Sequence, residues 1–361
     1  MKKKIGVLTL PLHKNYGGLL QAYALLVCLK KLDYETVLLN RKPNSSIIKN
    51  FLRSIVYFKR ERNIKQAEKN TRYFIEKYIN PKTEILNSNN KINNIVAKLN
   101  LYGIVVGSDQ VWRNGYSNGF YLNYFFDFIQ DNSIKKVSYA ASFGEDQWKE
   151  SKELTNNVTK LLQDFDKVSV REKSSLKLCK ENFNVDSEQH LDPTLLLTPD
   201  EYKTLFNEEK EPISKGDVLV YMLDINDDRQ KTIGYVSEYL KGKAFSVNSK
   251  GISGNENHEK VYPTVTSWLR GFYDAKFVVT DSFHGTIFSI LFNKPFVAYG
   301  NVDRGLSRFI SVLKMFGLEN RLILKYDDLD DEMLTKKIDW KNINDKLKVH
   351  RERSFDYLKG I

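Results

Sequence analysis

The stretch that most constrains this chain is 276–295, which reads KFVVTDSFHGTIFSILFNKP. It opens with the β-branched run 277–280, typical of a buried strand, and the apolar segment 286–292 predicts a helix. His284 is therefore expected where a strand gives way to a helix, at the carboxyl edge of a sheet, where open α/β folds bind ligands. A helix start also favours an anion. The alternative is a loop histidine that only forms local hydrogen bonds.

The caps of that helix can be read from the same stretch. Ser282 or Asp281 is expected to cap its start, and Asn293 with Pro295 marks its end.

Length and composition bound the class of protein. A chain of 361 residues suits two domains. Its 56 basic and 45 acidic residues give a net charge of +11, which favours anionic partners. The two cysteines, Cys28 and Cys179, lie far apart and predict buried thiols in a reducing compartment, with no metal site. Because no run approaches ~18 apolar residues, we predict a cytoplasmic protein.

The first forty residues predict a βαβ unit. A strand is expected over 4–10, a glycine loop at Gly17 and Gly18, a helix over 19–32 and a second strand over 35–40. This order of elements is used to bind phosphate, but without the full GxGxxG spacing it indicates a dinucleotide only weakly.

A basic helical insertion is predicted over about 41–100. Apolar residues at helical spacing over 47–56 oppose basic residues such as Arg53 and Lys59. The simple interpretation is an amphipathic helix of the domain. The alternative is peripheral contact with an anionic membrane surface, at the inner face of the cytoplasmic membrane.

Polar clusters recur directly after predicted strands. They follow the strands 102–106, 136–140 and 167–170, and an Asp-Pro turn begins at Asp192.

Because two βα-alternating halves follow each other, we predict an N-terminal Rossmann-like domain over 1–205 and a C-terminal one over 213–340. A terminal helix is predicted over 341–361, and it either follows the second domain or returns to the first. The facing carboxyl edges would form a cleft, with Gly17, Gly18, Asp109, Ser142 and Arg171 on one wall and His284 and Arg304 on the other.

Six ordered motifs then point to a family. They are NYGGLLQAYAL at 15–25, GSDQVW at 107–112, YAASFG at 139–144, SVRE at 169–172, LDPTLL at 191–196 and TDSFHG at 280–285. Over roughly 4–321 the chain resembles the polysaccharide pyruvyl transferase family. The resemblance implies a GT-B-like fold and transfer of a pyruvyl group from phosphoenolpyruvate to sugar hydroxyls of a cell-surface polysaccharide or its precursor, forming a ketal. It implies no cofactor beyond the donor substrate, and a glycan or lipid-linked glycan as acceptor.

The chemistry suggests roles for particular residues. Protonation of the donor's methylene carbon needs an acid active near neutral pH, for which His284 is the candidate. The family usually has an arginine where this chain has Ser282, whereas Arg171 matches the family's Val-Arg-Glu/Asp motif. We therefore expect Arg171, with Arg304 or Arg308, to bind the donor's anionic groups. Asp109 would accept a proton from a sugar hydroxyl or would only orient that hydroxyl. The other predicted site residues are Ser282 and Gly285 on the donor side and, on the acceptor side or lining the cleft, Tyr16, Gly17, Gly18, Ser108, Gln110, Trp112, Ser142 and Asp192.

Plainer interpretations stay open for several of these residues. Asp109 and Asp192 also suit turns or caps, Arg171 suits pairing with an internal carboxylate, and Trp112 suits a core. Two other functions remain open as well. One is a GT-B glycosyltransferase with a nucleotide-sugar donor; the other is a protein that binds anions or nucleic acid without catalysis, for which no DNA-binding motif is present.

Overall fold

The structure, a computed structural model, describes residues 2–42, 64–117, 119–248, 261–300 and 305–361. These residues form two compact units. The first contains the described parts of 1–62, 75–196 and 350–361, and the second contains those of 63–74 and 197–349.

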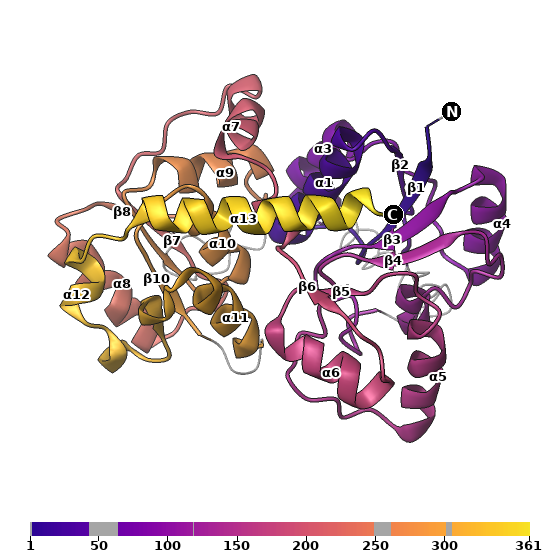
Figure 1. Ribbon diagram of the computed structural model, residues 1–361. Coiled ribbons are helices and arrows are strands. Elements are labelled where there is room, and N and C mark those ends of the chain that lie inside the picture. The colour runs from indigo at the N-terminus through magenta and orange to yellow at the C-terminus, as the bar shows by residue number, and fades with distance from the viewer. Residues whose placement is uncertain (1, 43–63, 118, 249–260, 301–304) are drawn as a thin grey trace, which may run out of the picture. The chain divides into compact units, whose positions relative to one another are not determined.

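The first unit is built on a parallel sheet, whose strands lie side by side in Figure 1. Its strand order is β2-β1-β3-β4, and all neighbours are parallel. A parallel pair, β5 and β6, continues this order because isolated bridges join Val137 to Lys167 and Ala141 to Val170. The strands are β1 (Lys4–Leu8), β2 (Glu35–Leu38), β3 (Gly103–Val106), β4 (Lys135–Ser138), β5 (Ser169–Val170) and β6 (Glu188–Gln189).

Helices connect these strands. The first begins three residues earlier than the predicted bound of 19, because the side chain of Asn15 caps it by accepting from the Gly18 amide at 3.2 Å. The helices are α1 (Tyr16–Lys31), α4 (Asn89–Leu99), α5 (Lys152–Leu162) and α6 (Lys173–Phe183), with 3-10 turns η3 (Tyr121–Phe125) and η4 (Pro193–Leu195). Helix α3 (Lys69–Tyr78) contains residues of both units.

The second unit has its own parallel sheet, in the order β11-β10-β9-β7-β8. Its strands are β7 (Val218–Tyr221), β8 (Ala244–Phe245), β9 (Phe277–Thr280), β10 (Phe296–Tyr299) and β11 (Leu322–Ile323). Its helices are α7 (Pro199–Glu208), α8 (Asp227–Tyr239), α9 (Val265–Asp274), α10 (Phe283–Leu291), α11 (Leu306–Phe316) and α12 (Asp331–Thr335), with 3-10 turns η5 (Glu319–Arg321) and η6 (Tyr326–Asp328). Helix α13 (Trp340–Lys359) contains residues of both units.

The two sheets share one topology. Counted within each unit, the first five strands of the first unit and the five strands of the second run 2-1-3-4-5, and β6 follows as a sixth strand in the first. This is the order of doubly wound folds that bind ligands at the carboxyl ends of the first and third strands. Those strands are β1 and β3 in the first unit and β7 and β9 in the second. The predicted α/β class with two Rossmann-like domains is confirmed, and the cleft between them stays a prediction.

The observed units run differently from the predicted bounds of 1–205, 213–340 and 341–361. Helix α7 belongs to the second unit, where Tyr202 meets the ring of Phe288 at a centroid distance of 5.1 Å. Part of the predicted insertion 41–100 also belongs there, since the Tyr262 amide donates to the Ala67 carbonyl. The end of α13 belongs to the first unit, which is the return considered above for the terminal helix; there the Tyr357 hydroxyl donates to the Ser138 carbonyl at 2.9 Å.

One sequence prediction concerns residues that the structure does not describe. The basic amphipathic stretch 47–60 lies outside the described residues. Within the described ranges, no helix combines the length and apolar character needed to cross a bilayer.

Candidate functional site

In the first unit, the predicted residues gather at the carboxyl edge of the sheet. Ser108 and Asp109 follow β3, Ser142 follows β4, Arg171 follows β5 and Asp192 follows β6. The parallel strands therefore bring together side chains that lie as much as 84 positions apart in sequence, as in the hydrogen bond from the Ser108 hydroxyl to Asp192 Oδ2 at 3.0 Å.

Asp109 has an unusual backbone at this edge. Its φ is +82°, in the left-handed region that residues other than glycine seldom adopt. Its carbonyl accepts hydrogen bonds from the amides of Val111 (2.8 Å) and Ser142 (3.1 Å), which hold this conformation. Its Oδ2 approaches the start of α1, because a Cβ placed on Gly18 would lie 3.4 Å from it. Strain of this kind is typical of functional positions.

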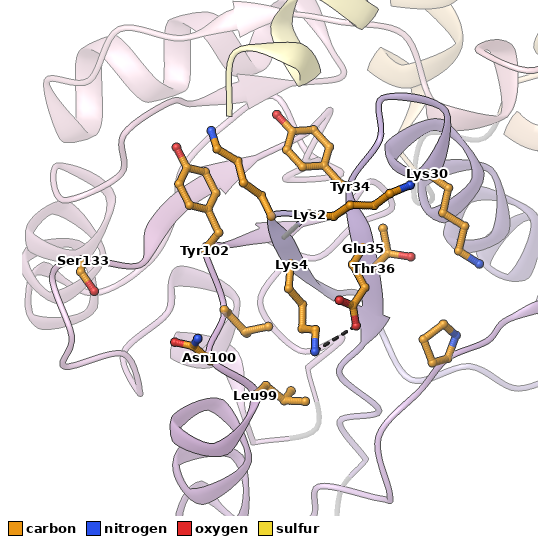
Figure 2. Close-up of a pocket in the computed structure, with 13 residues that line it drawn as sticks. Lys2, Lys4, Lys30, Tyr34, Glu35, Thr36, Leu99, Asn100, Tyr102 and Ser133 are labelled. Carbon is orange, nitrogen blue, oxygen red and sulfur yellow. Dashed lines mark ion pairs between the residues drawn. The ribbon is translucent and has the colours of Figure 1, made fainter.

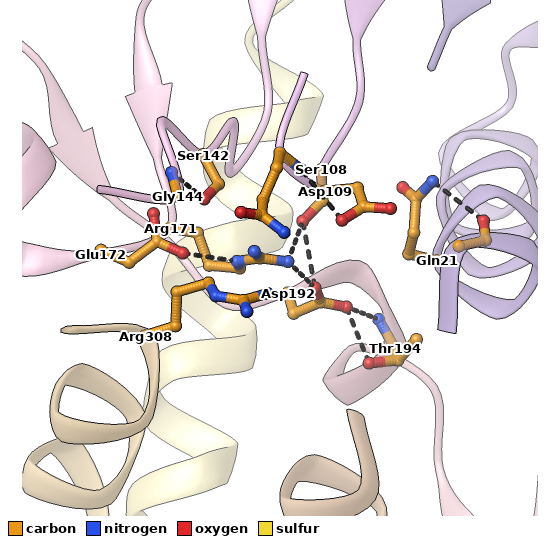
Figure 3. A network of polar contacts seen from close by, with 12 residues as sticks. Gln21, Ser108, Asp109, Ser142, Gly144, Arg171, Glu172, Asp192, Thr194 and Arg308 are labelled. Carbon is orange, nitrogen blue, oxygen red and sulfur yellow. Dashed lines mark hydrogen bonds and ion pairs between the residues drawn. The ribbon is translucent and has the colours of Figure 1, made fainter. Parts of the chain in front are cut away.

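A buried ion network lies behind Asp109 (Figure 3). Arg171 Nε donates to Glu172 at 2.8 Å, and Nη1 donates to Asp192 Oδ2 at 2.9 Å and to the Ser108 hydroxyl at 3.3 Å. The side chains of Arg171, Glu172 and Asp192 are at most 3% exposed. Asp192 also caps η4, since its Oδ1 accepts from the amide and hydroxyl of Thr194.

This network changes the expected role of Arg171. Burial by itself lowers the pKa of Arg171, but Glu172 and Asp192 outweigh burial and raise that pKa above its usual range. The guanidinium charge is thus balanced by two internal carboxylates, the alternative that the sequence had left open. The expected contact of Arg171 with the donor stays a prediction.

Trp112 is a core residue and does not line a surface. It is 1% exposed and stacks on Phe125 with ring centroids 5.3 Å apart, and its indole N–H donates to the Tyr124 carbonyl at 2.9 Å. The expectation that Trp112 contacts a sugar ring is therefore wrong. An aromatic side chain this large contributes more to stability when it is buried.

The remaining residues predicted on the acceptor side occupy the same edge. Tyr16, Gly17 and Gly18 form the first turn of α1, and Tyr16 is buried. The Ser142 hydroxyl accepts from the Gly144 amide at 3.0 Å, and Gln110 Oε1 accepts from Arg113 Nη1 at 3.0 Å.

In the second unit, His284 lies past the carboxyl end of a strand, as Asp109 does in the first. Both follow the third strand of their unit, and His284 lies in the first turn of α10, where it is buried. Ser282 is the N-cap, because its hydroxyl accepts from the Gly285 amide at 3.3 Å. Of the two predicted capping residues, Ser282 is the correct one. Asp281 instead accepts from the amides of Leu223 (2.6 Å) and Asp224 (3.1 Å).

Gly285 is required by close packing. A Cβ at this position would overlap the hydroxyl of Thr280, which donates to the Tyr221 carbonyl at 2.8 Å. The absence of a side chain lets the start of α10 lie against the end of β9, and this fixes the turn that carries His284.

Arg308 brings positive charge to this turn from the start of α11. Its guanidinium carbon lies 5.4 Å from the ring centroid of Phe283, and that ring lies 5.4 Å from the ring of His284. Arg308 is 8% exposed, and its Nε donates to the Gly305 carbonyl at 3.4 Å. The other predicted arginine, Arg304, lies outside the described residues.

Sequence reasoning assigned no role to two charged residues of these edges. Glu172 stands in the SVRE motif, but its pairing with Arg171 depends on burial, which the motif does not reveal. Arg229 of α8 reaches Asp281 at 3.8 Å from 52 positions away, and no local pattern signals this contact. Burial raises the pKa of Asp281, whereas the two amides and Arg229 lower it.

The described part of the chain holds no group of three or more His, Cys, Asp or Glu side chains placed to bind a metal ion.

The sequence matches the model of one known protein family. That model, described as polysaccharide pyruvyl transferase, matches residues 15–304, which is most of the chain. The match spans the carboxyl edges of both sheets, from Tyr16 to His284. The comparison with curated proteins gave no match.

Solved structures share the fold at low sequence identity. A crystal structure of Arabidopsis thaliana UGT89C1 complexed with quercetin is 11% identical and has a TM-score of 0.54, with 100% of this chain and 99% of that chain covered. A putative UDP-N-acetylglucosamine 2-epimerase from Listeria monocytogenes is 11% identical and has a TM-score of 0.51, with 98% of this chain and 91% of that chain covered. These similarities establish a GT-B-like fold and nothing about the substrate.

Proposed function

The chain belongs to the polysaccharide pyruvyl transferase family, and from this premise we propose that it transfers the pyruvyl group of phosphoenolpyruvate to two sugar hydroxyls of a cell-surface polysaccharide or its precursor. The product is a pyruvate ketal. The observation that carries the proposal is His284, buried in the first turn of α10 with Arg308 beside the same turn.

The second unit would bind the donor. Phosphoenolpyruvate carries a phosphate and a carboxylate, and both groups are stabilised by a helix start and by a guanidinium. Ser282 stands where the family usually has an arginine, and its hydroxyl caps α10. We therefore assign donor binding to Arg308, whose guanidinium lies beside the same turn. Arg308 would form charge-assisted hydrogen bonds to one of the two anionic groups.

His284 would then act as the general acid. It gives a proton to the methylene carbon of the enol, and the neighbouring carbon becomes an oxocarbenium-like centre. One sugar hydroxyl adds to this centre and loses its proton, for which Asp109 is the proposed acceptor. The second hydroxyl adds as phosphate departs, and its proton leaves with the phosphate. Atoms and charge balance, since one donor and two hydroxyls give one ketal and one hydrogen phosphate. The proton accepted by Asp109 returns to His284 through solvent, which restores both groups for the next turnover.

Two variants separate binding of the donor from chemistry. His284→Ala should bind phosphoenolpyruvate in calorimetry and lose phosphate release by about 10²-fold or more, since general acids contribute that much. Arg308→Ala should weaken donor binding by about tenfold, whereas Lys314→Ala, which removes a charge from the other end of α11, should not. Phosphate release is measured with a crude lipid-linked glycan fraction as acceptor. Near-normal turnover by His284→Ala would show that His284 is not the general acid.

A further inference from the structure

A cavity of about 770 Å³ lies at the opposite edge of the first unit's sheet, at the amino ends of its strands. It is lined by Lys4 and Glu35, which begin β1 and β2, and by Tyr102, which precedes β3 (Figure 2). Asp109 follows the carboxyl end of β3, so this cavity is separate from the edge that carries the proposed chemistry. Its size falls in the range of small-molecule sites.

The lining of this cavity is strongly basic. Four lysines, Lys2, Lys3, Lys4 and Lys30, face one carboxylate, that of Glu35. Lys4 pairs with Glu35 at 2.9 Å, and Lys2 pairs with Asp33 outside the lining. The other two have no carboxylate within ion-pair distance in the described part of the chain. Their charge is therefore uncompensated, and it attracts an anion.

The positions of these two amines are defined by other contacts. Lys3 Nζ lies 3.9 Å from the centroid of the Tyr102 ring, and Lys30 Nζ donates one of its protons to the Asn80 carbonyl at 2.8 Å. A lysine ammonium has three protons, so both amines keep donors for a ligand. Lysine is a point-charge ligand that suits phosphate.

A buried hydroxyl gives a second, independent indication of a ligand. Thr36 lines the cavity and is 2% exposed, and its Oγ1 has no hydrogen-bond partner among the described residues. A buried polar atom left in this state is energetically unfavourable, and a bound ligand with acceptor oxygens would give this hydroxyl a partner. Tyr34 also lines the cavity, and its hydroxyl donates to the Lys359 carbonyl at 3.2 Å.

We propose that this cavity binds a molecule that carries a phosphate or diphosphate group. Lys3 and Lys30 bind the anionic oxygens, the Thr36 hydroxyl donates to one of them, and the ring of Tyr102 contacts the organic part. The cavity exceeds what one phosphate fills, so the ligand has such a part. The same chemistry is offered by a soluble diphosphate and by the head group of an anionic lipid.

The test uses the full chain with two probes. Inorganic pyrophosphate is titrated calorimetrically, and vesicles of phosphatidylglycerol are compared with vesicles of phosphatidylcholine by sedimentation. The double variant Lys3→Gln/Lys30→Gln should weaken binding of at least one probe by about tenfold or more, and Thr36→Val should also weaken it. The control Lys152→Gln/Lys160→Gln removes the same charge from α5 and should bind as the unmodified protein does.

Arg308→Ala separates the cavity from the proposed donor site, since pyrophosphate binding at the cavity should persist in that variant. If only pyrophosphate binds, the natural ligand of the cavity is a soluble diphosphate compound. If only phosphatidylglycerol vesicles bind, the ligand is the head group of an anionic lipid. The proposal is overturned if neither probe binds, or if the two lysine double variants bind equally well.

Discussion

Acidification should destabilise the first unit through His190, which is buried where the end of α13 packs. The imidazole lies between aromatic rings, with centroids 4.5 Å from Tyr357 and 6.1 Å from Tyr139. Its Nδ1 lies 3.3 Å from the Ser354 hydroxyl, and its Nε2 lies 3.4 Å from a Glu188 carboxylate oxygen. Burial lowers the pKa of His190 to about 4, although Glu188 opposes that shift.

The sign of the effect follows from proton binding. The folded protein binds this proton more weakly than the unfolded chain, whose histidine keeps a pKa near 6.5. The unfolded state therefore takes up more protons between pH 6.5 and about 4, and the free energy of unfolding falls as the pH falls through that window. The difference between the two pKa values corresponds to about 3 kcal/mol in full, of which roughly 2.5 kcal/mol is lost by about pH 4.5.

Urea unfolding of the unmodified protein and of His190→Phe at about pH 7.5 and pH 4.5 measures this loss in the free energy of unfolding. Phenylalanine keeps a ring between the two tyrosines but does not titrate. The unmodified protein should lose roughly 2.5 kcal/mol more than the variant on acidification. Equal losses in the two proteins would refute the reasoning.

Two further substitutions test the edges of the sheets. Arg171→Met should lower the free energy of unfolding by about 3–5 kcal/mol, because Glu172 and Asp192 would stay buried without their cation; a loss under about 1 kcal/mol in urea titration would contradict the ion network. Gly285→Ala should cost about 1–3 kcal/mol and abolish phosphate release, because the added methyl overlaps the hydroxyl of Thr280 and displaces the turn. A stable and active Gly285→Ala protein would show that the start of α10 accommodates a methyl group, which would contradict this reasoning.

Much of the fold can be predicted from local pattern. Short β-branched runs such as 277–280 predicted strands that the structure contains, because strands inside a parallel sheet are buried on both faces and read as apolar throughout. Asp109 and His284 could be placed at carboxyl edges for the same reason: each polar cluster directly follows such a run.

What the sequence could not predict depends on contacts between distant positions. Residues 64–74 belong to the second unit and are held by hydrogen bonds such as that from the side-chain amide of Asn70 (Nδ2) to the Tyr262 carbonyl, 192 positions away. No periodicity within 41–100 reveals that partner. The pairing of Arg171 with Asp192 is likewise set by the register of β5 and β6, so a sequence match to a family arginine could not show that its charge is already balanced.

The most direct test of the proposed function is the thermal stability of the purified protein with phosphoenolpyruvate or with a panel of nucleotide sugars. A ligand at about 100 times its dissociation constant adds about 2.7 kcal/mol to the free energy of unfolding, which gives a readable shift. Stabilisation by phosphoenolpyruvate and by none of the nucleotide sugars is the result we predict. Stabilisation by a nucleotide sugar alone would contradict pyruvyl transfer and assign the chain to glycosyl transfer instead.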